Sequence, residues 1–277
     1  MLINNREKNI IIIPVYKDKI DKHEEISFRQ CCRILGKHRI CLVTYTNCDC
    51  GMYCKIALQH SVTLWRENFP EDYFDSIDGY NKLMLSHEFY LRFKRYEYML
   101  IYQLDAYVFR DELDSWCKKE YDYIGAPWFT GYKSISEGGK LWLVGNGGLS
   151  LRRISTMIRL FSKMHPTLSF KKIMRRKQRV SDNIFRNIIT SFVRSIGYKN
   201  NIEYYKKLYV GNEDTFICQY LTSLGVDLKI ATSEVAMYFS FEQNPSYLYS
   251  LTNNKLPFAC HAWFKYEYND FWNIYIK

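Results

Sequence analysis

Short apolar segments alternate with amphipathic ones along the first part of the chain, and this alternation restricts the fold more than any other feature. In "NIIIIPVY" (residues 9–16) the apolar run continues to Pro14, as expected for a central strand of a parallel sheet covered on both faces. Similar strand patterns follow in "RICLVTY" (39–45), "SVTLW" (61–65) and "YEYMLIYQLDAYVF" (96–109). Strands separated by helices imply right-handed crossovers, so we predict a doubly wound α/β fold with a mostly parallel central sheet.

Helices are predicted in the connections between these strands. Asp21 and Glu24 have the spacing of a capping box, and apolar residues then recur at helical spacing. A second helix is predicted across "KLMLSHEFYLRF" (82–93), and a third begins near Asn212 in "GNEDTFICQYLTSLG". The sequence has no internal repeat and no linker between two units, so residues 1–277 are predicted to form a single domain.

The composition is that of a globular protein that does not cross a membrane. Residues of the apolar types make up 47% of the chain and charged residues 25%, and no apolar run approaches the ~18 residues that a membrane span needs. The early apolar run is also too short for the core of a signal peptide, so we expect a cytoplasmic location. The nine cysteines show no paired zinc spacing, which favours free reduced thiols over a metal site.

The net charge of +10 is concentrated in one segment. Residues 152–207 contain 15 Lys/Arg and 2 Asp/Glu, a balance of +13, which leaves the rest of the chain at −3. We predict a basic, mainly helical insertion here, which could be a solvated helical face, an anionic-membrane patch or a nucleic-acid surface. Apolar residues interleave with the charges, which favours an amphipathic helix on a membrane surface, and no nucleic-acid motif accompanies them.

One carboxylate, Asp105, interrupts the apolar run "YQLDAYVF". Ligands of doubly wound sheets bind beyond the carboxyl ends of the strands, so residues 14–17 and 105–107 are expected to border one crevice. Asp105 either holds a divalent cation that neutralises a diphosphate or begins a turn in which local backbone amides satisfy its carboxylate.

Three later motifs each have a functional and a purely structural interpretation. The pair Glu213 and Asp214 is either a general base with its orienting neighbour or two acids that favour the first turn of a helix. His261 is a metal ligand, a phosphate contact, or a packed or surface residue. The glycines of "GNGG" (145–148) allow either a close approach to a ligand or a tight turn, and they match no phosphate-binding signature.

Together these motifs resemble the GT-A class of nucleotide-sugar glycosyltransferases. More specifically, the chain resembles a bacterial domain-of-unknown-function family that occurs in capsule and O-antigen polysaccharide gene clusters. The matching segments, in order from residue 11 to residue 263, are "IIIPVYK", "NKLMLSHEFY", "MLIYQLDAYVF", "YDYIGAPW", "GNGGLSLR", "NEDTFIC" and "PFACHAW". The resemblance implies a single GT-A-like, Rossmann-like domain, within which residues 152–207 are an insertion.

The resemblance also implies the residues of the donor side. Asp105 would occupy the place of the metal-binding Asp-x-Asp motif, whose second Asp is Tyr107 here, and His261 would sit where several GT-A enzymes place a late His on the metal. The expected Mn²⁺ or Mg²⁺ would then have one carboxylate fewer, unless lysines neutralise the diphosphate. The residues assigned to nucleotide-sugar binding are Pro14, Val15, Tyr16, Lys17, Lys82, Gln103, Asp105 and Tyr107.

On the acceptor side, the resemblance assigns the general base to Asp214, with Glu213 second. Contact with the transferred sugar and the acceptor is assigned to Trp128, Asn146, Gly147 and Gly148. The implied function is an inverting, hexosyltransferase-like transfer from a UDP-linked donor to a hydroxyl of a glycan or lipid-linked glycan acceptor. The enzyme would work peripherally at the inner face of the cell membrane, against its anionic surface. A nucleotidyltransferase of sugar phosphates, or a non-catalytic carbohydrate- or nucleic-acid-binding module, remains an alternative, although a nucleic-acid partner is not expected.

Overall fold

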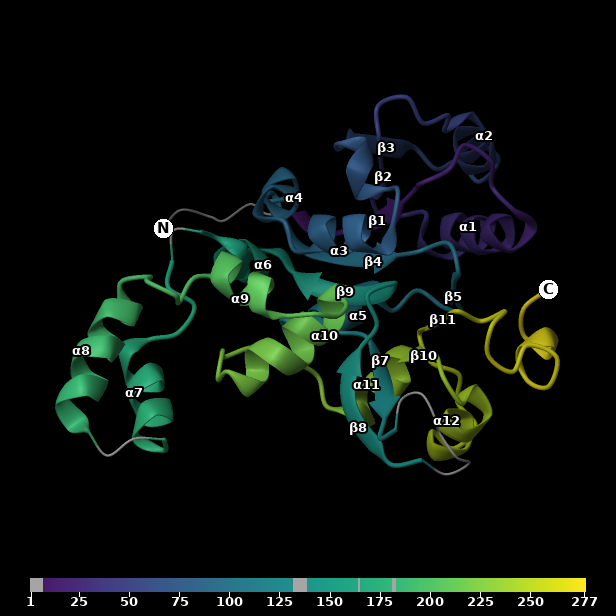
Figure 1. Cartoon of the computed structure of the whole chain (residues 1–277). Helices are drawn as coiled ribbons and strands as arrows, with labels where there is room; N and C mark the ends of the chain where they lie inside the picture. The colour runs from purple at the N-terminus through teal and green to yellow at the C-terminus, as the bar shows by residue number, and fades with distance from the viewer. Residues whose placement is uncertain (1–6, 132–138, 164, 181–182) are drawn as a thin grey trace.

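The computed structural model describes residues 7–131, 139–163, 165–180 and 183–277, and its centre is a six-stranded sheet (Figure 1). The strands are β1 (Glu7–Pro14), β2 (Ile40–Thr44), β3 (Leu64–Asn68), β4 (Tyr96–Tyr102), β6 (Tyr123–Ile124) and β9 (Leu149–Arg153). Their order across the sheet is β3-β2-β1-β4-β9-β6. Strands β1 to β4 are parallel, whereas β9 is antiparallel to both β4 and β6. The predicted α/β class with a mostly parallel central sheet is confirmed.

Successive residues of β1 point to opposite faces of this sheet, and helices cover both faces. Ile11 and Ile13 pack into the core on the side of α1 (Lys22–Leu35), α2 (Gly51–Gln59) and α5 (Leu113–Cys117). Ile10 and Ile12 pack into the core on the side of α3 (Ile77–Met84), α4 (His87–Arg92), α6 (Ile154–Phe161) and α9 (Ile202–Leu208). Burial on both faces explains why the strand is apolar throughout.

Helix α1 begins with the predicted capping box. The Asp21 carboxylate accepts a hydrogen bond from the Glu24 N–H at 3.0 Å, and the Glu24 carboxylate accepts one from the Asp21 N–H at 3.0 Å. The single helix predicted across residues 82–93 is wrong, because the chain there forms the end of α3 and then α4. The Ser86 hydroxyl accepts a hydrogen bond from the Phe89 N–H at 3.4 Å and starts the second helix as its N-cap.

The run 96–109 is also two elements rather than one strand. Strand β4 ends at Tyr102, the chain turns with the Ala106 N–H donating to the Gln103 carbonyl at 2.9 Å, and β5 (Ala106–Val108) follows. Strand β5 belongs to a second sheet, in which it pairs with β11 (Ala259–His261), and β11 pairs with β10 (Ser240–Phe241). Asp105 therefore lies in the turn between two sheets.

A third, two-stranded sheet and the last helices complete the body of the molecule. Strand β7 (Ala126–Phe129) pairs with β8 (Leu141–Gly145), and α11 (Ser233–Phe239) packs on both. Helix α12 (Pro245–Leu251) and a 3-10 turn (Trp272–Ile274) enclose an aromatic cluster around Trp263 and Trp272. Helix α10 (Glu213–Thr215) begins after Asn212, as predicted, and continues as a π-helix, η2 (Phe216–Leu221). A short 3-10 helix, η1 (Glu71–Tyr73), lies between β3 and α3.

Residues 152–207 are largely helical, but the segment that stands apart from the sheets is shorter than this. Arg152 lies within β9 and is completely buried, and α6 and α9 contribute Met157 and Ile202 to the main core. Within the described ranges, α7 (Phe170–Gln178) and α8 (Ile184–Ser195) project from the body, packed on one another, and Ile173 of α7 still joins the main core (Figure 1). Among the described residues, no helix combines the length and the apolar character that crossing a bilayer requires.

Candidate functional site

A cavity of about 630 Å³ opens where β1 and β4 end, as expected for the carboxyl edge of a doubly wound sheet. Its walls come from segments that are far apart in the sequence, including the turn after β4, the loop between β8 and β9, and the start of α10. Most of the residues predicted for the site line this cavity. They are Pro14, Tyr16, Lys17, Gln103, Asp105, Asn146, Gly147, Gly148, Glu213, Asp214 and His261.

Four predicted residues lie elsewhere. Val15 is buried in the core, and Lys82 is exposed on α3 outside the cavity lining. Tyr107 belongs to β5 and packs its ring against Phe109, with 5.3 Å between the centroids, inside the aromatic cluster. Trp128 is buried beneath Gly145, where an added Cβ would lie 1.8 Å from its ring. None of these four residues is part of the cavity lining, so their assignment to ligand binding stays a prediction.

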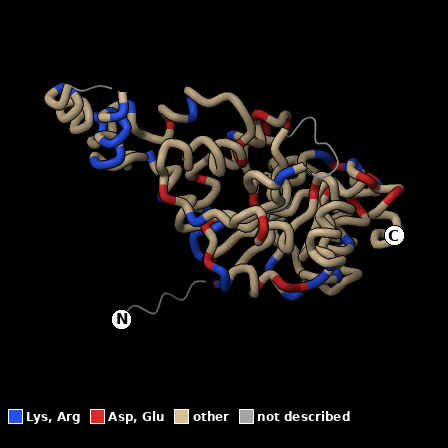
Figure 2. Tube along the Cα trace, turned by 90° about the horizontal axis from the view of Figure 1, so that it is seen from below, with Lys and Arg blue, Asp and Glu red and all other residues tan. Residues whose placement is uncertain are grey.

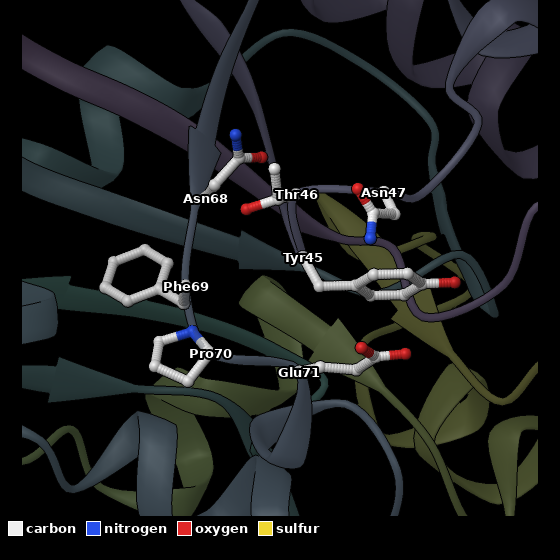
Figure 3. Close-up of a pocket in the computed structure, with 7 residues that line it drawn as sticks. All are labelled: Tyr45, Thr46, Asn47, Asn68, Phe69, Pro70 and Glu71. Atoms are coloured by element: carbon white, nitrogen blue, oxygen red, sulfur yellow. The ribbon is translucent and has the colours of Figure 1, made fainter.

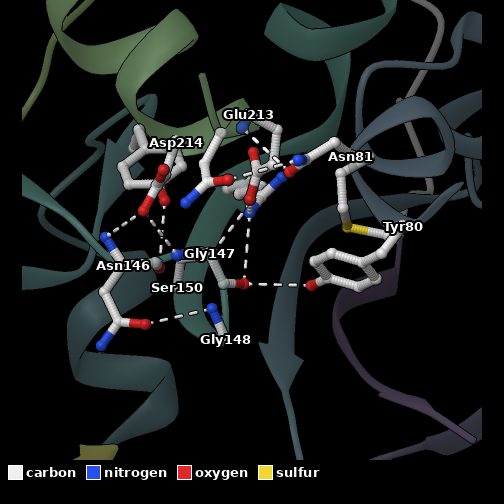
Figure 4. A network of polar contacts seen from close by, with 12 residues as sticks. Tyr80, Asn81, Asn146, Gly147, Gly148, Ser150, Glu213 and Asp214 are labelled. Carbon is white, nitrogen blue, oxygen red and sulfur yellow. Dashed lines mark hydrogen bonds and ion pairs between the residues drawn. The ribbon is translucent and has the colours of Figure 1, made fainter. Parts of the chain in front are cut away.

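The Asp214 carboxylate organises the glycine-rich loop between β8 and β9 (Figure 4). Its Oδ2 accepts hydrogen bonds from the N–H groups of Asn146 at 3.0 Å and Gly147 at 3.1 Å. Its Oδ1 accepts one from the Thr215 N–H at 2.7 Å. Burial raises the pKa of Asp214 although these backbone donors oppose the rise, and the nearby Glu242 raises it further. A fixed carboxylate with a raised pKa suits a general base.

The loop itself has a defined conformation. Asn146 has a φ of +76°, in the left-handed region that asparagine tolerates better than most residues. Its side-chain Oδ1 accepts hydrogen bonds from the N–H groups of Gly148 at 3.0 Å and Leu149 at 3.2 Å. An added Cβ on Gly147 would lie 2.2 Å from Glu213 Oε1, and one on Gly148 would lie 2.0 Å from His261 Nε2. Both glycines are therefore required by the close approach of acidic and histidine side chains.

Glu213 forms a buried ion pair that the sequence did not reveal. Its Oε1 lies 2.7 Å from Arg152 Nη2, and the side chains are 1% and 0% exposed. Arg152 also donates to the Tyr90 hydroxyl at 2.9 Å and to the Ser150 hydroxyl at 3.0 Å. Burial raises the pKa of Glu213 and Arg152 opposes the rise, so the carboxylate serves as counterion to a guanidinium that stays protonated.

The second oxygen of this carboxylate is free for a ligand. Glu213 Oε2 is buried and has no hydrogen-bond partner among the described residues, and Glu213 lines the cavity. Its backbone is fixed, because the Glu213 N–H donates to Asn81 Oδ1 at 3.1 Å. A buried acceptor without a donor is costly, and a ligand hydroxyl would remove that cost.

Pairing of β5 with β11 brings Asp105 and His261 together. His261 Nε2 lies 2.9 Å from Asp105 Oδ1, and its Nδ1 lies 3.1 Å from Glu242 Oε1. Burial alone would lower the pKa of His261, but the two carboxylates outweigh it and raise that pKa to about 10. Burial likewise acts to raise the pKa of Asp105, yet the facing His261 and Lys265 hold it well below its usual range. Glu242 and Lys265 both line the cavity, and no motif in the sequence pointed to either.

The Asp105–His261 pair fits a divalent cation. Asp105 Oδ1 and His261 Nε2 face one another at 2.9 Å, and neither atom has a further hydrogen-bond partner among the described residues. Two ligands in adjacent positions of a cation, each ~2.1 Å from it, lie about 3 Å apart. Glu242 on the other ring nitrogen would orient the imidazole, as carboxylates behind metal-bound histidines do.

A cation held there would take most of its ligands from outside the protein. The described residues contain no group of three or more His, Cys, Asp or Glu side chains placed to hold a metal. Mg²⁺ and Mn²⁺ sites commonly combine one or two protein ligands with phosphate oxygens and water. Lys17, a predicted neutralising cation, is instead paired with Asp21 at 3.0 Å and Glu24 at 2.9 Å. The lysine that lies beside the pair is Lys265, whose Nζ is 3.2 Å from Asp105 Oδ2.

A second hollow of about 470 Å³ lies at the ends of β2 and β3 (Figure 3). Its lining residues are Tyr45, Thr46, Asn47, Asn68, Phe69, Pro70 and Glu71. None of the buried acids described above and no histidine contributes to it. The chemistry-bearing side chains therefore gather in the larger cavity.

The fold and site define the chain as an α/β protein with an acidic, glycine-lined cavity at the strand ends. The family model described as "Protein of unknown function (DUF5672)" matches residues 63–261, and the chain belongs to this family. A search of curated proteins finds no significant match.

Similar solved structures share little sequence with this chain. The apo-form glycosyltransferase GlyE of Streptococcus pneumoniae TIGR4 is 12% identical with a TM-score of 0.43, and the match covers 93% of this chain but only 55% of that one. The galactosyltransferase LgtC in complex with donor and acceptor sugar analogs is 13% identical with a TM-score of 0.43, covering 91% and 86% of the chains. A glycosyltransferase involved in the glycosylation of the major capsid of PBCV-1 is 10% identical with a TM-score of 0.38, and the match covers 92% of this chain and 93% of that one. Likeness at this level defines neither the fold family nor the reaction.

Proposed function

We propose that this protein is a GT-A-type glycosyltransferase that moves a hexose from a UDP-linked donor to a hydroxyl of a glycan or lipid-linked glycan acceptor. The single observation that carries the proposal is the shared cavity, in which a buried carboxylate of raised pKa, a tight glycine loop and the Asp105–His261 pair all meet. These groups correspond to a base, a space for a sugar, and a holder for a diphosphate. The biological setting that we propose is synthesis of a bacterial surface polysaccharide, such as capsule or O-antigen.

On the acceptor side, Asp214 takes the proton of the attacking hydroxyl. Its position is supported by three backbone N–H donors, which hold the carboxylate without removing its negative charge. Gly147 and Gly148 line the cavity beside it and contact the transferred sugar, and Glu213 Oε2 accepts a hydrogen bond from a sugar hydroxyl. One base and an in-line attack give a single displacement with inversion at the sugar carbon.

On the donor side, Asp105 and His261 would hold Mn²⁺ or Mg²⁺. When bound, the cation supplies positive charge to the leaving diphosphate. Lys265 lies at the same wall of the cavity and adds a second positive charge. Pro14 and Tyr16 border the nucleoside, and Tyr16 is half exposed at the cavity, so its ring is available for stacking.

The proposal includes an arrangement and a location. Residues 1–277 act as one catalytic domain, and the basic part of residues 152–207 meets an anionic membrane surface, so that the enzyme works peripherally at the inner face of the cell membrane. The supporting observation is the balance of +13 in that segment.

A panel of nucleotide sugars, each with and without Mn²⁺, tests the proposed reaction. Thermal shift reports donor binding, and chromatography of the products identifies what is released. We expect one UDP-sugar to stabilise the protein more strongly with Mn²⁺ present and to release UDP in the presence of an acceptor. Release of pyrophosphate would indicate a nucleotidyltransferase instead, and binding without any turnover would indicate a carbohydrate-binding module. Failure of every nucleotide sugar to shift the melting temperature would overturn the proposal.

A further inference from the structure

Helix α8 has its polar side turned inward and its apolar side turned outward. The two buried residues of this helix are Asn187 and Ser191. On its opposite side are large apolar side chains, exposed by 44% to 81%, which we call the outer face of α8. These are Ile184, Phe185, Ile188, Ile189, Phe192 and Ile196. Single exposed apolar residues are common on proteins, but a continuous stripe of them marks an interaction surface.

The inner side of α8 is unsuited to burying that stripe, because the neighbouring helix is basic. Lys177 of α7 donates a hydrogen bond to the Thr190 hydroxyl of α8. Burial lowers the pKa of Lys177, and the nearby Arg194 and Arg186 lower it further, as expected where several cations gather. The side of α8 that faces α7 therefore includes a polar contact in positively charged surroundings. If α8 were rotated so that its apolar side faced α7, that side would contact lysine and arginine rather than apolar residues.

The charge of the hairpin indicates what covers the outer face. Residues 170–199 contain nine Lys/Arg and one acidic residue, Asp182, which lies outside the described residues. Figure 2 shows the basic residues concentrated on the projecting α7, beside the largely uncharged α8. A second copy of this chain seated on the outer face would bring two strongly positive hairpins together. An anionic lipid surface would neutralise the charge and accept the apolar side chains at once.

We propose that the α7–α8 hairpin is a membrane-docking element, with the outer face of α8 inserted among the acyl chains and the cations of α7 against anionic lipid headgroups. Twelve residues of helix are ~18 Å long, too short to span a bilayer, so α8 lies in the plane of the interface. This assignment deepens the membrane location proposed above by naming the element, but it does not depend on which reaction the cavity performs.

Vesicle sedimentation of the full chain tests the proposal without any activity measurement. We expect the protein to bind vesicles of phosphatidylcholine with phosphatidylglycerol, and to bind pure phosphatidylcholine vesicles far more weakly. The double variant Phe185→Ser/Phe192→Ser should weaken binding at least ~10-fold, because two inserted rings are lost. The matched control is Leu58→Ser/Ile274→Ser, which changes two equally exposed apolar residues outside the hairpin and should bind like the wild type.

A second measurement locates the helix in the bilayer. Phe185→Trp adds a fluorophore on the outer face, and its emission should shift to shorter wavelength when anionic vesicles are added. Equal binding by Phe185→Ser/Phe192→Ser and the wild type, or no blue shift in Phe185→Trp, would overturn the proposal. A dimer in ultracentrifugation that Phe185→Ser/Phe192→Ser abolishes, with no vesicle binding by the wild type, would assign the face to self-association instead.

Discussion

Arg152 Nη2 and Glu213 Oε1 lie 2.7 Å apart, and both side chains are completely buried. This ion pair joins β9, which lies between β4 and the edge strand β6, to the first turn of α10. The two adjacent acids therefore have different roles. Glu213 neutralises the buried Arg152, whereas Asp214 lines the cavity and accepts hydrogen bonds from the glycine-rich loop. Removing either partner would leave an isolated charge in the interior.

We predict that Arg152→Met lowers the free energy of unfolding by about 3–5 kcal/mol, because the Glu213 carboxylate loses its counterion inside the protein. The matched control is Arg29→Met, which breaks a pair of partly exposed side chains between Arg29 and Glu25 and should cost less than ~1 kcal/mol. Urea unfolding followed by circular dichroism measures both values. Equal losses in the two variants would contradict the assignment of Arg152 to the core.

Gly147→Ala should damage the site through its shape. The new Cβ would lie 2.2 Å from Glu213 Oε1, so the loop or the ion pair must move, at a cost of about 1–3 kcal/mol in stability. Donor binding by the panel method should weaken together with stability. Gly51→Ala, whose new Cβ would lie 3.1 Å from the nearest side-chain atom on the exposed start of α2, should leave both quantities close to wild type.

Asp214→Asn tests the proposed base. The amide oxygen can still accept from the Asn146 and Gly147 N–H groups, whereas the Thr215 N–H loses its acceptor, so we expect the melting temperature to fall by roughly a few degrees. The turnover number with the donor found by the panel should fall by ~10²–10⁴, the range that loss of a general base typically causes. Asp270→Asn, at an exposed position, should retain full turnover. A variant Asp214→Asn with wild-type turnover would rule out its role as base.

An aspartate introduced at position 107 should not create a stronger metal site. Tyr107 is 7% exposed and its ring packs against Phe109 and Trp263, so Tyr107→Asp would bury a charge in the aromatic cluster. We expect a loss of ~3 kcal/mol or more in stability and no gain in Mn²⁺ affinity by calorimetry. Tyr107→Phe keeps the ring and should stay within ~1.5 kcal/mol of wild type. Tighter Mn²⁺ binding by Tyr107→Asp would show that position 107 reaches the cavity.

The pH dependence of stability should report on His261. The pKa of His261 is raised to about 10 in the folded protein, against 6.5 for an unperturbed histidine, so its contribution is complete below pH 6.5. That contribution is lost as the pH rises towards 10, at ~1.4 kcal/mol for each unit of pKa difference. In buffer with a chelator, unfolding free energies measured from pH 6.5 to 10 should decline in the wild type and decline less in His261→Gln. His165→Gln, at an exposed position, should follow the wild type.

The sequence predicted the parts of the fold that depend on local patterns. The continuous apolar run of β1 and the capping box of Asp21 and Glu24 have direct physical causes within a few residues, and both were found. The break between β4 and β5 could not be seen, because β5 leaves the central sheet to pair with β11, more than a hundred residues later. Tyr107 was assigned to the cavity for the same reason.

Candidate site residues could be predicted where a sequence motif contains them. Those that only the packing of the chain brings to the site could not. Asp105, His261 and the acidic pair stand out as polar residues in apolar or ordered contexts, and all four line the cavity. Arg152 was read as the start of a basic segment, because the residues around it in the sequence do not indicate that it pairs with the buried Glu213. Glu242 and Lys265 join the site only through the strand pairing of β10 and β11.

The pairing of β5 with β11 also determines when the cavity can form during synthesis of the chain. Residues 106–108 leave the ribosome long before residues 259–261, so the turn that carries Asp105 has no partner strand while the intervening chain is being made. Contacts of such long sequence separation form late and slow the folding of a domain. Until residues 259–261 are made, the nascent chain lacks the wall of the cavity that contains His261. We therefore expect a ligand that contacts this wall to bind only after β11 has paired with β5.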